Sequence, residues 1–216
     1  DHLLGLVGSE MCIRDRGMAP QASRPIATTH RRLSYREIAS LGAEGLRRAA
    51  GVDVAFLHTS QIVRATLPVG DVDVNALFRT AGQRAHEVVA VTLSGAEIHA
   101  YVEGLANSRW GPTQWSGFRG RYSRDGERKR LESDLEPLRR YRVAMPKKEW
   151  DTRFLRFFQR SGDVEGVDVE HLLALQPTPV STSFTEAVAR LLDSAGDGSS
   201  PGDVAAAIQR DALLEE

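Results

Sequence analysis

The chain has 216 residues, 41% of them apolar, and carries 28 Lys and Arg against 29 Asp and Glu. This length suits one domain of ordinary size with an additional segment. No stretch approaches the ~18 consecutive apolar residues of a membrane-spanning helix, and the single cysteine, Cys12, excludes an internal disulfide.

Residues 1–17 differ in character from the rest of the chain. Their letters L-V-G-S-E-M-C-I-R-D-R resemble a translated sequencing adapter, so we predict a non-native segment and exclude it from fold reasoning. An ordinary apolar N-terminus and a signal-peptide remnant are the alternatives. The lack of a basic region and of a long apolar run disfavours the signal peptide. On the adapter interpretation, the authentic N-terminus is missing.

Charge is distributed unevenly. Residues 18–160 hold 24 Lys and Arg against 15 Asp and Glu, whereas residues 161–216 hold 2 against 11. A basic body suits a partner that carries phosphate. The alternative is an Arg-rich solvated surface shielded by the acidic tail, and charge alone favours this alternative.

Strands are predicted where apolar runs or alternation are bounded by turn residues. In chain order they cover residues 26–33, 52–57, 88–93, 118–123 and 140–145. Asp125 and Gly126 predict a hairpin turn after the fourth strand, and Pro146 ends the fifth.

Helices are predicted where a capping residue precedes apolar positions at helical spacing. The capping residues are Ser34, Asp73, Ser94, Ser183 and Ser200. Strands and helices mix without strict β-α-β alternation, so the predicted class is α+β, a mixed β-sheet packed with helices. Residues 161–216 are predicted to form an acidic tail with two short helices.

Three motifs in the middle of the chain carry a family resemblance. Residues 52–70 read V-D-V-A-F-L-H-T-S-Q-I-V-R-A-T-L-P-V-G, followed by V-V-A-V-T-L-S-G-A-E-I and W-S-G-F-R. In this order they resemble the C-terminal substrate-recognition domain of 5'-nucleotidases, which has N-x-G-G-I-R-A, V-x-V-x-L-T-G and an S-G turn. The resemblance covers about residues 24–145 and implies such a domain over 18–160.

The resemblance implies four substrate-binding residues. Arg64 matches the arginine of G-G-I-R, which points toward the nucleotide, and a guanidinium suits phosphate. Arg84 and His86 stand at the Phe and Asn of P-F-G-N. Arg84 can still stack on a base, and His86 can donate a hydrogen bond to it. Gly117 matches the S-G turn, where glycine allows close backbone approach.

Departures from the family pattern leave alternatives open at each position. Both glycines of the family turn are replaced, and His58 stands where the family has Asn. An exposed loop arginine without a ligand is therefore as good an interpretation of Arg64 as a phosphate-binding residue. Arg84 and His86 are better explained as polar residues that precede a strand, and Gly117 equally well as a plain turn glycine.

The last family motif follows the strand from Tyr141 to Ala144. The family then supplies a second aromatic ring and a carboxylate in G-G-D-G-Y. Here Lys148 falls at the position of that ring, and Trp150 and Asp151 are the candidate substitutes.

No catalytic residue and no metal ligand is predicted in this chain. Two-metal phosphoesterases collect Asp, His and Asn ligands, which the family carries as D-x-H, G-D-x-x-D and G-N-H-D/E, and none of these occurs here. The six histidines lack metal-ligand spacing. The resemblance therefore implies that two divalent cations belong to a missing N-terminal metallophosphoesterase domain of the same polypeptide.

The predicted function is nucleotide recognition within a 5'-nucleotidase-like hydrolase of nucleotide catabolism, inactive as this chain alone. Family analogy implies a periplasmic, cell-surface or secreted location. The alternative is a degenerate binding or scaffolding module of the same fold. A nucleic-acid partner is not predicted, because no recognition motif accompanies the basic charge.

Overall fold

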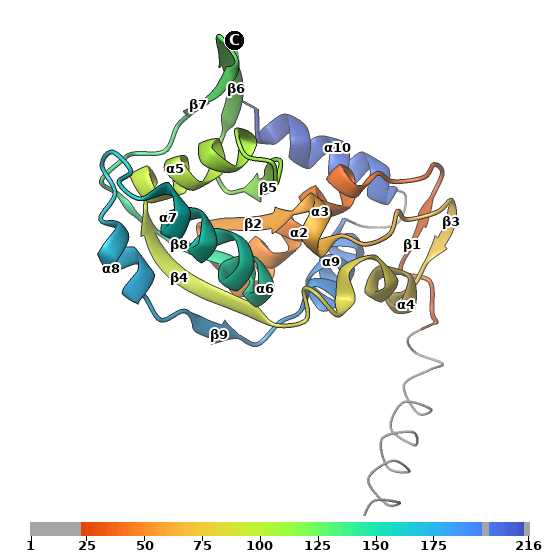
Figure 1. Cartoon of the computed structure of the whole chain (residues 1–216). Helices are drawn as coiled ribbons and strands as arrows, with labels where there is room; N and C mark the ends of the chain where they lie inside the picture. The colour runs from red at the N-terminus through yellow and green to blue at the C-terminus, as the bar shows by residue number, and fades with distance from the viewer. Residues whose placement is uncertain (1–22, 196–198, 214–216) are drawn as a thin grey trace, which may run out of the picture.

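The computed structural model describes residues 23–195 and 199–213 (Figure 1), so the predicted adapter segment lies outside the described residues. At its centre is a five-stranded sheet in which β2 and β8 are parallel and the other neighbours antiparallel. In spatial order the strands are β5 (Thr113–Ser116), β2 (Val54–His58), β8 (Arg140–Pro146), β4 (Val88–Ser94) and β9 (Thr178–Val180). The predicted strands 52–57, 88–93 and 140–145 therefore share one sheet, as expected.

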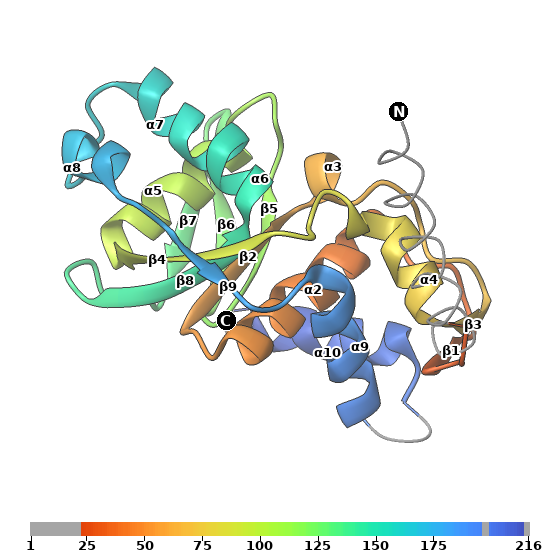
Figure 2. The same ribbon diagram turned by 90° about the horizontal axis from the view of Figure 1, so that it is seen from below.

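Helices cover both faces of this sheet, as Figure 2 shows. One face packs against α2 (Tyr35–Ala50), and α9 (Phe184–Ser194) and α10 (Pro201–Asp211) pack in turn against α2. The other face packs against α5 (Gly95–Ala106), the π-helical turn η2 (Trp150–Phe154), α7 (Leu155–Ser161) and α8 (Val169–Ala174). Strand β2 shows why there are two cores: Val54 and Phe56 enter one, and Ala55 and Leu57 the other, because successive side chains point to opposite faces.

Short elements connect and flank these layers. They are β1 (Ala27–Thr29), α3 (Thr59–Ile62), β3 (Gly70–Val72), α4 (Val74–Leu77), the π-helical turn η1 (Phe78–Gly82), β6 (Gly120–Asp125), β7 (Arg128–Ser133) and α6 (Lys147–Glu149). Strand β1 pairs with β3, and β6 with β7. The predicted strand 26–33 is thus reduced to three residues in a small separate sheet, and the hairpin turn at Gly126 is confirmed by its φ of 61°.

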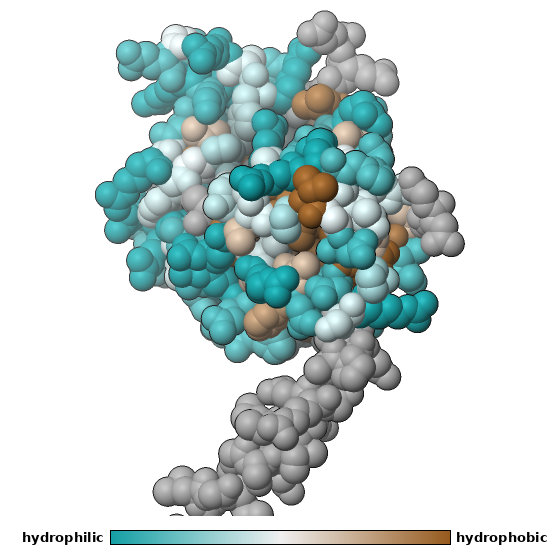
Figure 3. All heavy atoms as spheres, turned by 90° about the vertical axis from the view of Figure 1, so that its right-hand side faces the viewer, coloured by the Kyte–Doolittle hydropathy of each residue, from teal (hydrophilic) through white to brown (hydrophobic). Residues whose placement is uncertain are grey.

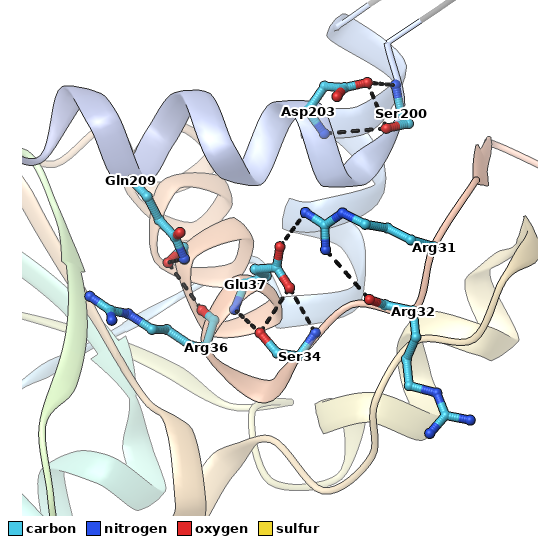
Figure 4. Close-up of polar contacts among 9 residues, drawn as sticks. Arg31, Arg32, Ser34, Arg36, Glu37, Ser200, Asp203 and Gln209 are labelled. Carbon is cyan, nitrogen blue, oxygen red and sulfur yellow. Dashed lines mark hydrogen bonds and ion pairs between the residues drawn. The ribbon is translucent and has the colours of Figure 1, made fainter.

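Helix α2 begins and ends where its local sequence predicts. The Ser34 hydroxyl accepts from the Glu37 amide, and the Glu37 carboxylate accepts from the Ser34 amide at 2.9 Å. The ion pair of Arg31 with Glu37, drawn in Figure 4, lowers the pKa of Glu37 to about 2. Gly51 ends the helix with a φ of 59°, which favours glycine.

The acidic tail is part of the same packing. Its described residues hold α8, β9, α9 and α10, so the prediction of two helices missed α8 and β9. Val180 of β9 pairs with Val88 of β4, and Phe184 is fully buried. The Gln209 amide of α10 donates to Ser40 of α2 at 3.2 Å. Packing is therefore continuous across the predicted boundary at residue 160.

The face formed by β1, β3 and α4 is mainly hydrophilic, with small scattered apolar areas (Figure 3). Among the described residues, the exposed large apolar side chains are Tyr35, Val69, Phe78, Leu138 and Leu213. None of the described helices combines the length and the apolar character needed to cross a bilayer.

Candidate functional site

Polar residues gather where β2 and β8 end and where β4 and β5 begin. His58 at the end of β2 pairs with Thr113 at the start of β5, and Pro146 at the end of β8 pairs with Val88 at the start of β4. We call this the His58 end of the sheet. Helices α3 and α6 begin there and contact each other, as their neighbouring positions in Figure 1 indicate. Loops at one end of a sheet commonly carry binding residues.

Arg64 and Arg84 lie together at the His58 end. The Arg64 amide donates to the Thr80 carbonyl at 2.6 Å, and Arg84 Nη1 donates to the Gln61 carbonyl at 3.0 Å. These bonds fasten the turn after α3 to the segment before β4. The Arg64 side chain is exposed. Arg84 therefore has a positioning contact, whereas Arg64 presents its guanidinium to solvent.

His86 also lies at this end, on the side of β4. It is exposed and lines a hollow of about 630 Å³ together with Lys147, Trp150 and Val180. The Lys147 amide donates to the Glu87 carbonyl at 2.8 Å, which holds α6 beside His86. Three of the four predicted residues are thus brought to one region.

Gly117 lies at the opposite end of the sheet. It follows β5, which runs antiparallel to β2, and it meets Asp53 ahead of β2. The five residues of β2 span about 17 Å. A Cβ at Gly117 would lie 1.9 Å from the Asp53 carbonyl oxygen, and its φ is 105°. Backbone packing therefore accounts for this glycine, and the four predicted residues do not form one cluster.

The proposed substitutes in the last motif have other contacts. Trp150 is 2% exposed and stacks on Phe154 with ring centroids 4.7 Å apart. Asp151 forms an ion pair with Lys147 at 2.6 Å. Both side chains are therefore already engaged within the domain.

Glu149, which sequence reasoning missed, is the most perturbed carboxyl group at this end. It is fully buried and accepts from the His58 amide at 2.8 Å, the Thr113 hydroxyl at 3.0 Å and the Tyr101 hydroxyl at 3.2 Å. Burial raises its pKa to about 7, against the lowering effect of these donors. No local pattern marks Glu149, because its donors come from distant parts of the chain.

His58 and Gly111 form the neighbouring part of the site. His58 Nε2 donates to the Gly111 carbonyl at 3.2 Å, and Gly111 has a φ of 75°. Burial, together with the charge of Arg153, lowers the pKa of His58 to about 4. The ring is therefore neutral at pH 7. Gly111, unlike Gly117, lies at the His58 end.

These groups can bind and orient a polar ligand through hydrogen bonds and charge. Within the described residues, no group of three or more His, Cys, Asp or Glu side chains is arranged to hold a metal ion.

Comparisons with known proteins give a family and a set of similar folds. The family model described as "5'-nucleotidase, C-terminal domain" matches residues 17–147. Comparison with curated proteins gives no match.

Three solved structures illustrate the fold similarity. A 5'-nucleotidase precursor from Thermus thermophilus has 21% identity and a TM-score of 0.55, with 88% of this chain and 40% of that chain covered. The sulfate thiohydrolase SoxB from the same organism, in complex with glycerol, has 22% identity and a TM-score of 0.54, with 86% and 36% covered. The NAD nucleotidase NadN of Haemophilus influenzae has 16% identity and a TM-score of 0.59, with 91% and 40% covered. The chain thus spans 36–40% of these proteins.

Proposed function

Because the chain belongs to the 5'-nucleotidase C-terminal domain family, we propose that it recognises the nucleotide substrate of a phosphoester hydrolase. One observation carries the assignment of a site: the exposed Arg64 guanidinium stands on a turn that Arg84 and the Thr80 carbonyl hold in place. A guanidinium offers two parallel charge-assisted bonds to a phosphate. His86 adds a hydrogen-bonding ring at the same end.

The cleavage chemistry is assigned to a separate metallophosphoesterase domain of the same polypeptide. The described residues do not fit a dinuclear metal centre, and the similar structures are more than twice as long as this chain. Two divalent cations in such a domain would activate water for attack on phosphorus. Family analogy also supports a periplasmic, cell-surface or secreted location.

Calorimetric titration with AMP and adenosine tests the recognition role. We expect Arg64→Ala to weaken AMP binding about tenfold to a hundredfold, as for loss of a charged hydrogen bond of about 1.5–3 kcal/mol. Adenosine binding should stay unchanged, because adenosine has no phosphate. The matched control is Arg128→Ala, at an exposed position of β7. AMP affinity unaltered by Arg64→Ala would contradict the assignment.

A separate assay tests the assignment of the cleavage chemistry to another domain. The purified chain, mixed with Mn²⁺ or Co²⁺ and AMP, UMP or a UDP-sugar, should show no turnover. Turnover above the blank would refute the assignment of chemistry to another domain.

A second candidate is a binding or scaffolding module that keeps the fold without nucleotide recognition. It is favoured by the replaced motif residues at Arg84, His86 and Lys148. The same titrations discriminate, because this candidate requires both AMP and adenosine to bind no more tightly than about 1 mM.

A further inference from the structure

A group of arginines lies beside Trp110, next to His58, and none of them is among the residues that carry the proposed function. The guanidinium carbons of Arg153 and Arg160 lie 4.9 and 5.4 Å from the ring centroid of Trp110. Arg109 and Arg160 line a hollow of about 220 Å³ with Trp110. Arg156 lies close enough to act electrostatically on Arg153, as does Arg109. We call Trp110 and these four residues the arginine cluster.

The positive charge of the cluster is not balanced by ion pairs. None of its four arginines pairs with a carboxylate in the described part of the chain. The nearby carboxyl group of Glu149 attracts Arg153 electrostatically, but it forms no ion pair with it and accepts instead from His58, Thr113 and Tyr101. Arg156 and Arg109 repel the charge of Arg153, and a bound anion would relieve this repulsion.

Arg153 is unusual among the four because it is buried. Only 8% of the residue is exposed, and its Nε has no hydrogen-bond partner. Nη1 donates to the Thr152 carbonyl at 3.3 Å. Burial lowers its pKa, as do the charges of Arg156 and Arg109, while Tyr101 and Glu149 act in the opposite direction. A buried donor without a partner costs about 1–3 kcal/mol. Stacking on Trp110 explains the position of Arg153, but not why Arg156 and Arg109 lie near it.

We propose that the arginine cluster binds a phosphate-bearing anion. Arginine forks bind phosphate oxygens with paired, charge-assisted hydrogen bonds. Exposed Arg109 and Arg160 line the hollow and can contact the anion from the solvent side, while Arg153 and Arg156 add positive charge nearby. The volume of about 220 Å³ suits an ion of the size of phosphate or pyrophosphate rather than a whole nucleotide. None of these residues belongs to the Arg64 region, so the inference does not rest on the proposed function.

The test titrates the full chain with inorganic phosphate and with pyrophosphate at low ionic strength, where screening is weak. Calorimetry gives the affinity, and the NMR resonance of the Trp110 indole N–H shows whether the anion binds beside that ring. We expect pyrophosphate to bind more tightly than phosphate and to shift the Trp110 resonance. Arg109→Gln and Arg160→Gln change exposed side chains, so the fold should persist, and each should weaken binding about tenfold. Arg128→Gln is the matched control, and sodium chloride corrects for ionic strength.

Two results would overturn the proposal. One is no detectable pyrophosphate binding at about 10 mM, well above the millimolar range of weak sites. The other is binding that survives both cluster variants but is lost in Arg64→Ala. Failure of the nucleotide proposal looks different, because AMP and adenosine would then fail to bind while pyrophosphate still shifts Trp110. Comparison of AMP with phosphate shows whether the anion is bound free or as part of a nucleotide.

Discussion

Replacing Glu149 with Gln should reveal two opposing titrations in the buried network. Glu149→Gln keeps the shape of the side chain and removes its ionisation. Its amide oxygen can still accept from the His58 amide, and the hydroxyls of Thr113 and Tyr101 can rotate to accept from the new NH₂ group. The variant should therefore fold.

The magnitude follows from the two pKa shifts. Burial raises the pKa of Glu149 from 4.5 to about 7, so the stability that it contributes is full below pH 4.5 and is lost as the pH rises through 7. At about 1.4 kcal/mol per pKa unit this amounts to about 3 kcal/mol. Burial lowers the pKa of His58 from 6.5 to about 4, so its contribution is full above pH 6.5 and is lost as the pH falls through 4. Between pH 4.5 and 6.5 the two effects cancel.

Urea unfolding of both proteins from pH 5 to pH 8 measures the difference. The free energy of unfolding of the variant, relative to the wild type, should rise by about 2–3 kcal/mol over this range. The free energy of unfolding of the variant itself should increase by about 1 kcal/mol for each unit by which the pH rises from 5 to 6.5. The reason is that the titration of His58 is no longer opposed by that of Glu149.

The matched control is Glu170→Gln, which removes an exposed carboxylate of α8 and should leave the profile parallel to the wild type. A difference between Glu149→Gln and the wild type that stays within about 0.5 kcal/mol from pH 5 to pH 8 would refute the buried-carboxyl reasoning.

Two further predictions concern stability. Gly117→Ala should destabilise the protein by about 3 kcal/mol or more, because the new Cβ would lie 1.9 Å from the Asp53 carbonyl oxygen and alanine would need a φ of 105°. The control Gly126→Ala, with a φ of 61° and open space around it, should cost only about 1–2 kcal/mol. Equal shifts of the urea midpoint in the two variants would contradict this prediction. Phe184→Ala in α9 should lower the free energy of unfolding by about 3–5 kcal/mol, because the ring is fully buried against α2. A decrease of less than about 1 kcal/mol in thermal or urea unfolding would show that the acidic tail is not part of the core.

Elements specified by local contacts could be predicted from the sequence. Helix α2 is the clearest case, because Ser34, Glu37 and Gly51 set its ends through bonds within a few residues. Strands β2, β4 and β8 were predictable from apolar runs, since a strand buried on both faces needs apolar residues on both. The motif order was enough to assign the family, which the match over residues 17–147 confirms.

The tertiary structure alone decided which residues meet. Antiparallel pairing of β5 with β2 carries Gly117 to the far end of the sheet and brings Gly111 to His58. The pKa of Glu149 depends on donors 36 to 91 residues away, and the arginine cluster forms because α7 packs beside the loop that bears Trp110. Burial and charge at these positions are sums over distant neighbours, which no local pattern in the sequence encodes.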